Sequence, residues 1–129
     1  MNQPRLLDYL DHIEAALDLA DKIVSECDEE DFMEGRCPLH DAAAVRQVEL
    51  IGEIATQIRI RYRSLIDAHP EVPWKTIWDT RNRWIHGYFN VDLSIVWHTI
   101  ARDLPSLRKV LAPLRATAQK IEPRCDEEG

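Results

Sequence analysis

The sequence predicts an all-α protein, an up-and-down bundle of four to five helices in a single domain. Apolar residues recur every three or four positions over several long segments, as one face of a helix requires. No segment alternates apolar and polar residues in the manner of a half-buried strand. Short connections favour antiparallel neighbouring helices. The length of 129 residues fits one domain, residues 1–129, and we expect residues 119–129 to form a frayed tail.

Two long helices are predicted in the first half of the chain. Pro4 suits the first turn of the first one, and its apolar stripe is Leu6, Leu10, Ile13, Leu17, Ala20 and Val24. The acidic stretch ECDEEDFME (26–34), followed by Gly35 and Pro38, predicts a solvated loop. A second helix follows from about Asp41, its candidate N-cap, to Asp67. Its buried side is Val45, Val48, Ile51, Ala55, Ile58, Tyr62 and Leu65.

Shorter helices are predicted in the second half. AHPEVPW (68–74) contains two prolines and must be a connection. A third helix starts near Trp74 and ends before Gly87, and Asp92 is the candidate cap of a fourth, LSIVWHTIARDL (93–104), in which we expect Trp97 and His98 to pack. Pro105 opens a short fifth helix, SLRKVLAPL (106–114), whose end Pro113 disturbs.

Charge is unevenly distributed along the chain. The net charge of −7 combines −9 over residues 1–42, +5 over residues 43–124 and −3 over residues 125–129. The overall charge argues against non-specific affinity for nucleic acid, but the local charge of the later two thirds does not. No apolar run approaches the roughly 20 residues of a membrane span. The N-terminus is an acidic amphipathic segment rather than a signal peptide, which favours the cytoplasm.

The cysteines are predicted to be reduced. Cys27, Cys37 and Cys125 are an odd number in a chain without an export signal. Cys37 and His40 have the C-x-x-H spacing of some zinc sites, with Cys27 ten residues earlier. A zinc site usually needs four ligands in two close pairs, and the fourth is missing. We therefore expect no metal and no other cofactor.

The most reactive combination of side chains is in TRNRWIHGYFN (80–90). If the third helix continues to His86, Asn82 lies on the same face, and the long side chain of Arg81 can reach round to it. Gly87 can leave the helix in a left-handed conformation, and Tyr88 then follows in a loop. A purely structural explanation exists, because Arg and His stabilise the last turn of a helix through its dipole.

The surrounding sequence resembles the HepT family of toxin-like HEPN-domain proteins, whose motif reads R-x-x-x-x-H-x-Y. Here the motif is Arg81, His86 and Tyr88, with Asn82 beside the arginine. The resemblance extends to AVRQVELIGEIA (44–55), to VPW (72–74) and to IARDLPSLRKVL (100–111), so it covers nearly the whole chain in the same order.

The resemblance implies a metal-independent endoribonuclease toxin that works as a homodimer, with two motifs facing each other across the interface. Cleavage of RNA without a metal uses the 2′-hydroxyl as the nucleophile. His86, with an ordinary pKa of about 6.5, would transfer protons, and Arg81 would stabilise charge on the phosphate. Asn82 would hold a phosphate oxygen or orient His86. A second copy would supply the opposite acid, which one motif lacks.

The resemblance also implies a separate nucleotidyltransferase antitoxin of the MntA type, as in a type VII toxin–antitoxin pair. It would transfer AMP to Tyr88, and the added negative charge would exclude RNA from the site. The leading alternative is a non-catalytic docking or substrate-binding subunit for that nucleotidyltransferase. A weaker one is a structural helical adaptor, which would have no need of this motif at a helix end.

The candidate RNA contacts are Arg83 and two members of a basic cluster, Arg59 and Arg63. Arg59, Arg61 and Arg63 do not share one helix face, so the simpler interpretation is a solvated helix whose arginine stems cover apolar surface. Contact with the RNA backbone is the functional alternative. Glu53, in the middle of the second helix, is either a buried partner for Arg81 or an exposed carboxylate.

Overall fold

The protein is all-α, as predicted. The computed structural model describes residues 5–85 and 92–122, with the backbone only for residues 80–85, and no strand occurs in these ranges. The helices are α1 (Leu6–Glu26), α2 (Glu29–Met33), α3 (Pro38–Arg61), α4 (Arg63–Ala68), α5 (Trp74–Ile85), α6 (Leu93–His98), the π-helix η1 (Thr99–Asp103), α7 (Pro105–Arg108) and α8 (Leu111–Ile121). Within the described ranges, no helix has the length and apolarity needed to cross a bilayer.

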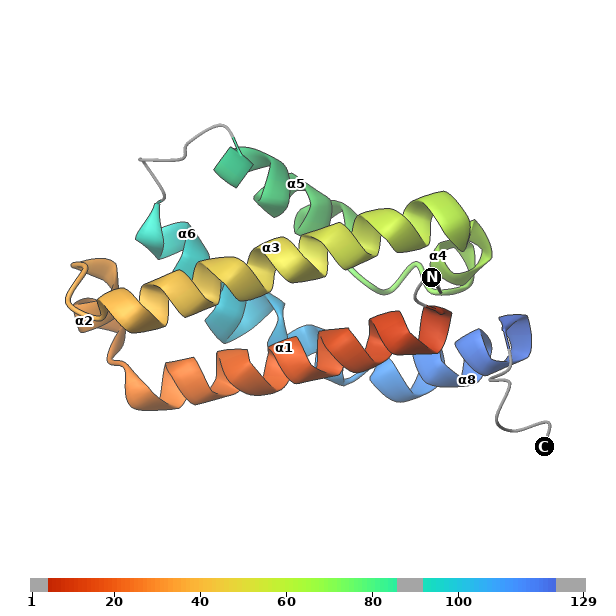
Figure 1. Cartoon of the computed structure of the whole chain (residues 1–129), viewed down its shortest axis with the longest axis horizontal. Helices are drawn as coiled ribbons and strands as arrows, with labels where there is room; N and C mark the ends of the chain where they lie inside the picture. The colour runs from red at the N-terminus through yellow and green to blue at the C-terminus, as the bar shows by residue number, and fades with distance from the viewer. Residues whose placement is uncertain (1–4, 86–91, 123–129) are drawn as a thin grey trace.

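The two longest helices, α1 and α3, run antiparallel and side by side (Figure 1). α5 lies along the other side of α3, and α8 lies along the N-terminal half of α1 (Figure 1). The core fills the space between them, and Leu10, Leu17, Ile51 and Ile58 each expose 1% or less of their surface. The apolar stripes read from the sequence are therefore the faces that meet in the bundle.

The uneven charge of the chain has a structural role. Basic residues of the C-terminal helices bind acidic residues of α1 at N–O distances of 2.7–3.0 Å: Arg108 pairs with Asp18 and Asp21, and Arg115 with Asp11 and Glu14. Exposed pairs of this kind contribute about 0–1 kcal/mol each. These two arginines join α7 and α8 to α1, so part of the positive charge of the later chain is occupied within the molecule.

The acidic stretch is not the solvated loop that the sequence predicts. Its centre forms α2, whose N-cap Asp28 accepts a hydrogen bond of 2.9 Å from the Glu30 amide. Phe32 is fully buried, with its ring centroid 5.2 Å from that of Trp97 in α6. Periodicity could not predict α2 because five residues are too few to define a helix face.

The expectation of reduced thiols is wrong for two of the three cysteines. Cys27 and Cys37 form a disulfide across the segment that contains α2. The turn of the chain around α2 brings together the end of α1 and the start of α3, a proximity that sequence spacing alone does not reveal. Cys125 lies outside the described residues.

The predicted second helix begins earlier and ends earlier than expected. Pro38 occupies its first turn, so Asp41 lies inside α3 and is not the cap. The chain leaves helical geometry at Tyr62, with φ −134° and ψ 52°, and α4 begins at the next residue. Tyr62 is buried as predicted, and Val45 is half-buried. No proline or glycine lies at the break, and Tyr62 makes a tertiary contact that is described below.

The C-terminal segments also differ from prediction. The expected fourth helix is capped by Asp92, as predicted. It continues as the π-helix η1, in which the Leu104 amide donates a hydrogen bond to the Thr99 carbonyl. Pro105 then starts α7. Pro113 lies in the first turn of α8, where its missing N–H does no harm, and α8 continues to Ile121, so residues 119–121 are helical rather than frayed. Trp97 is buried as expected, whereas His98 is exposed.

Candidate functional site

The start of α5 is held by a buried histidine in the preceding connection. His69 is 8% exposed, and its ring nitrogens lie 2.8 Å from Glu71 Oε2 and 2.7 Å from Thr117 Oγ1 in α8. The hydrogen bond with His69 lowers the pKa of the Glu71 carboxyl. The His69 carbonyl accepts a bond of 3.1 Å from the Trp74 indole N–H. This connection therefore ties the first residue of α5 to α8.

α5 lies against α3 through one face. Trp74 and Ile77, both 6% exposed, belong to the core that α3 shares. Lys75 and Asp79, four residues apart, form an ion pair of 2.9 Å on the outside. A helix anchored at its start and along one side is a rigid support for whatever its C-terminal end carries.

The end of α5 carries part of the predicted motif. Arg81, Asn82 and Arg83 lie on the helical backbone of the last two turns, which confirms the helix that the sequence assigns to them. Their side chains are not described, and His86 and Tyr88 lie outside the described residues. The geometry among the motif side chains therefore stays a prediction.

An arginine–tryptophan stack lies one turn before Asn82. The Arg59 guanidinium carbon is 4.7 Å from the centroid of the Trp78 ring, which stacks on Trp74 at 6.4 Å and 22°. Arg59 is exposed, whereas the Trp78 indole nitrogen is buried and has no hydrogen-bond partner among the residues that the structure describes. Trp78 belongs to no motif in the sequence, although the i, i+4 spacing of Trp74, Trp78 and Asn82 marks one helix face.

The rest of the basic cluster is engaged within the molecule. Arg61 donates a bond of 3.0 Å to the Tyr9 hydroxyl, and its guanidinium lies 5.3 Å from the Tyr62 ring. Arg63 pairs with Asp67 at 3.5 Å, with both side chains exposed. The interpretation in which arginines cover apolar surface therefore applies to Arg61. Of the two alternatives for Glu53, the structure shows the exposed carboxylate.

Two of the three tyrosines lie in a buried network at the other end of α3. Tyr62, 8% exposed, donates its hydroxyl proton to Glu122 Oε2 at 2.5 Å, and Glu122 Oε1 accepts from the Leu6 amide at 2.8 Å. Burial and the neighbouring Glu122 carboxylate raise the pKa of Tyr62 to about 12. Burial opposes ionisation of Glu122, but its hydrogen bonds prevail and lower its pKa. Tyr9 is 7% exposed.

Metal ligands do not gather in the part of the chain that the structure describes. No group of three or more His, Cys, Asp or Glu side chains there is arranged to hold a metal ion. Cys27 and Cys37 are bonded to each other, and the His40 imidazole lies 3.0 Å from the Glu26 carboxylate. Cys37 and His40, the two residues of the C-x-x-H spacing, therefore each interact with another protein group.

Comparison with known proteins agrees with the motif and the fold. The family model described as "Ribonuclease HepT-like" matches residues 13–114. The chain belongs to the HepT-like ribonuclease family. It is 36% identical over 109 residues to "Probable ribonuclease HepT" of Thermococcus cleftensis, covering 84% of this chain and 94% of that protein. It is also 36% identical over 109 residues to "Putative RNase TTE0752" of Caldanaerobacter subterraneus subsp. tengcongensis, covering 91% of that protein. No solved structure matches.

Proposed function

We propose that this protein is a metal-independent endoribonuclease that acts as the toxin of a toxin–antitoxin pair. The observation that carries the proposal is the R-x-x-x-x-H-x-Y sequence, whose Arg81 lies on α5, within a chain that matches the HepT-like ribonuclease model over residues 13–114. The names of two relatives, which both contain RNase or ribonuclease, support the same class of reaction.

The proposed reaction is transesterification of RNA. The 2′-hydroxyl oxygen forms a bond to the adjacent phosphorus while the bond from phosphorus to the 5′-oxygen breaks, which leaves a 2′,3′-cyclic phosphate and a 5′-hydroxyl. His86 takes the proton from the 2′-hydroxyl or returns one to the 5′-oxygen, because imidazole titrates near neutrality. Arg81 stabilises the charge that grows on the phosphate, and Asn82 holds a phosphate oxygen or orients His86.

The proposed enzyme is a homodimer with its two motifs at one cleft. In-line cleavage needs a base on the attacking side and an acid on the leaving side. One copy offers a single motif histidine, His86, whereas two copies offer one for each side. Two observations support a dimer: one motif contains only one histidine for proton transfer, and the chain belongs to the HepT-like family.

RNA contacts outside the motif are proposed for Arg59 in preference to Arg63. Arg59 is exposed, and its guanidinium lies on the Trp78 ring one helical turn before Asn82. A stacked guanidinium can contact a phosphate or the face of an unpaired base. Arg63 is partly neutralised by Asp67. Arg83 remains a candidate because of its position in the last turn of α5.

The proposed control is AMP transfer to Tyr88 by a separate nucleotidyltransferase. The phenol oxygen would form a bond to the α-phosphorus of ATP, and pyrophosphate would leave. Tyr88 follows His86 by two residues in the sequence, so the phosphate added to it would repel the RNA phosphate from the site of cleavage. Tyr9 and Tyr62 are both buried, and the Tyr62 hydroxyl is bonded to Glu122, which supports Tyr88 as the acceptor by elimination. We propose the cytoplasm as the location, because RNA and ATP are both available there.

Growth on expression of the chain alone separates the enzyme from the docking-subunit alternative. We expect the wild-type chain to arrest growth and His86→Ala to be harmless at equal protein level. Arg83→Ala alters the same helix end but spares the proton-transfer group, and we expect it to reduce toxicity less than His86→Ala does. Equal growth with wild type and His86→Ala would favour the docking subunit.

A further inference from the structure

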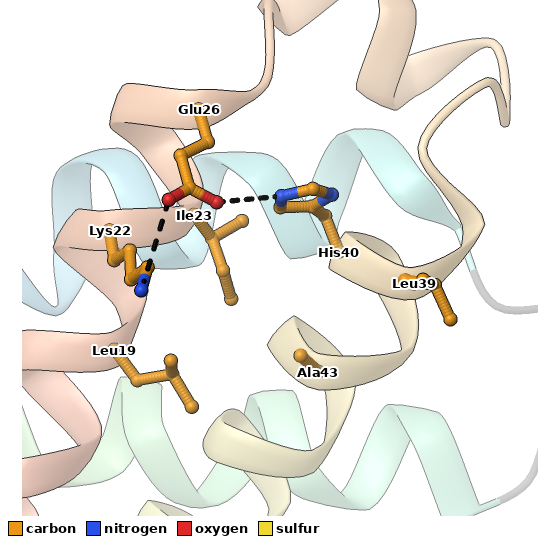
Figure 2. Close-up of a pocket in the computed structure, with 7 residues that line it drawn as sticks. All are labelled: Leu19, Lys22, Ile23, Glu26, Leu39, His40 and Ala43. Atoms are coloured by element: carbon orange, nitrogen blue, oxygen red, sulfur yellow. Dashed lines mark hydrogen bonds and ion pairs between the residues drawn. The ribbon is translucent and has the colours of Figure 1, made fainter.

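A hollow separates the end of α1 from the start of α3. It measures about 220 Å³, and its apolar lining includes Leu19 and Ile23 of α1 and Leu39 and Ala43 of α3. Figure 2 shows these side chains around an open centre. Leu39 is 84% exposed, so it contributes little packing between the two helices. Since protein cores are close-packed, a hollow of this size means that apolar packing holds these two helix ends only weakly.

An ion pair and a disulfide join the two helix ends. The Glu26 carboxylate of α1 lies 3.0 Å from the His40 imidazole of α3 (Figure 2). Both side chains are partly exposed, and water screens an ion pair at the surface, so this link contributes little. The other link is the covalent bond between Cys27, the C-cap of α1, and Cys37, the N-cap of α3. Of these two links, the disulfide is the stronger.

The disulfide also encloses α2. The five residues of α2 lie between the two cysteines, and a helix this short does not persist alone because helix nucleation is unfavourable. The disulfide joins the ends of the segment that contains α2, and Phe32 in its middle is fully buried. Reduction removes the first of these constraints and leaves α2 more dependent on the second.

Phe32 links the disulfide loop to α6. Its ring centroid lies 5.2 Å from that of Trp97, and the two residues are 0% and 7% exposed. α6, with Asp92 as its N-cap, is the helix that follows the motif residue His86 in the chain. Contacts with α2 and α3 help to hold α6 in place. Loosening α2 therefore weakens one of the contacts that fix the position of the chain just after the motif.

We propose that Cys27 and Cys37 are a reversible thiol–disulfide pair whose oxidation state controls the order of α2 and α6 and, through α6, the rate of RNA cleavage. This inference rests on the ribonuclease and the cytoplasmic location in the proposed function. Disulfides of cytoplasmic proteins are usually transient and either catalytic or redox-sensing, because cellular thiols keep other cysteines reduced. The disulfide form, which holds α2, is the more active form, and the dithiol form is the less active one.

The unequal exposure of the two cysteines sets the order of exchange with a dithiol reductant. Cys27 is 4% exposed, whereas Cys37 is half-buried, so a thiolate of the reductant attacks the Cys37 sulfur. A bond forms between these two sulfurs while the bond to Cys27 breaks, and Cys27 leaves as a thiolate that takes a proton from water. The second thiolate of the reductant then attacks the first sulfur of the reductant and releases Cys37, which takes the second proton. Two electrons pass to the protein, the reductant becomes a cyclic disulfide, and a disulfide oxidant reverses the steps.

Equilibration in glutathione buffers tests whether the pair is reversible. The Cys125→Ser variant is used, so that only Cys27 and Cys37 are counted. After equilibration at graded ratios of reduced to oxidised glutathione, free thiols are blocked with N-ethylmaleimide and counted by intact mass spectrometry. We expect the pair to pass from both thiols blocked to neither blocked within the series. A pair that stays fully reduced or fully oxidised throughout would overturn the proposal.

Fluorine NMR of protein labelled with fluorotryptophan tests the link to α6 without RNA. The signal of Trp97 is assigned by its loss in Trp97→Phe. We expect this signal to shift or broaden when the disulfide is reduced, because Phe32 then packs on the Trp97 ring less firmly. Trp74, which is bonded to the His69 carbonyl at the start of α5, is the internal reference and should not respond. A Trp97 signal that is the same in both forms would overturn the link.

RNA cleavage by the two forms separates this inference from the proposed function. We expect reduction to slow cleavage about fivefold or more, the low end of typical coupling between sites. The variant with both Cys27 and Cys37 changed to serine should cleave as slowly as the dithiol form and ignore reductant. Tyr62→Phe, which alters the network at the other end of α3, is the control for general loss of stability and should keep the wild-type response.

Equal, measurable rates in the two forms would overturn the control by oxidation state but leave the ribonuclease standing. A response to reductant that persists in the double serine variant would also overturn it. No cleavage by either form would overturn the ribonuclease itself, and with it any control of cleavage.

Discussion

Tyr62→Phe removes one hydroxyl from the network that joins α3, α8 and the start of α1. The hydroxyl donates to Glu122 at 2.5 Å, and a hydrogen bond to a charged group contributes about 1.5–3 kcal/mol. Glu122 keeps the Leu6 amide and the Arg5 side chain as donors, so it is not left unpaired. We therefore expect Tyr62→Phe to lower the free energy of unfolding by an amount at the low end of this range, about 1.5 kcal/mol. For a chain of this length that corresponds to a fall of roughly 5 °C in Tm.

The effect of Tyr62→Phe should depend on pH in a definite direction. The pKa of Glu122 is lowered in the folded state, so its contribution is present above its unfolded value and is lost as the pH falls through the folded value. The pKa of Tyr62 is raised to about 12, so its contribution is complete below its ordinary value of 10.0 and is lost as the pH rises through 12. The difference from wild type should therefore be largest near neutrality.

The assay is thermal unfolding at one fixed protein concentration, since dimerisation would make Tm depend on concentration. Tyr9→Phe is the matched control. Among the described contacts its hydroxyl accepts only from Arg61, whose exposed charge is screened by water, so we expect a smaller loss of about 0.5 kcal/mol. A Tm for Tyr62→Phe equal to wild type at neutral pH would refute the reasoning. So would a difference that is unchanged when Glu122 is protonated.

Three further outcomes are expected. Reduction of the Cys27–Cys37 disulfide, which closes a loop with a sequence separation of 10, should lower the free energy of unfolding by about 2.8 kcal/mol in urea titrations, whereas a variant with both cysteines changed to serine should not respond to dithiothreitol. Mass spectrometry after co-expression with a neighbouring nucleotidyltransferase should find AMP on the wild-type chain and none on Tyr88→Phe; AMP elsewhere would contradict the proposed acceptor. Arg59→Gln should weaken binding of single-stranded RNA and reduce its salt dependence more than Arg63→Gln does, and the reverse order would count against the stacked arginine as a contact.

The long helices could be predicted because their apolar residues recur at helical spacing. Leu6, Leu10 and Leu17 follow such a stripe, and all three are buried along α1. Capping chemistry is equally local, so Asp92 could be assigned to the start of a helix before the structure was known. These features depend on residues within a few positions of one another, which a sequence displays directly.

The features that escaped prediction depend on contacts between distant segments. Tyr62, where α3 ends, donates its hydroxyl proton to Glu122, 60 residues away in sequence. The Cys27–Cys37 pair forms because α2 turns the chain, and α2 itself is fixed by Phe32 packing on Trp97. The periodic pattern of apolar residues within one segment does not show which distant segment it will contact.

The candidate site divides in the same way. Its motif could be found because Arg81, His86 and Tyr88 are close in sequence and occur in a family pattern. The stack of Arg59 on Trp78 joins α3 to α5, so only the folded chain brings it into view. The proposed RNA cleavage therefore comes from the family resemblance of the motif, whereas the neighbouring Arg59–Trp78 stack is found only in the structure.

The central claim is that Arg81 and His86 cleave RNA by using its own 2′-hydroxyl. The most direct measurement is the chemical identity of the product ends after incubation of purified protein with single-stranded RNA in EDTA. We predict a 2′,3′-cyclic phosphate, or its opened form, and a 5′-hydroxyl, with both lost in Arg81→Ala and in His86→Ala. Products with a 5′-phosphate, or cleavage that requires magnesium, would contradict the account and indicate attack by a metal-bound water.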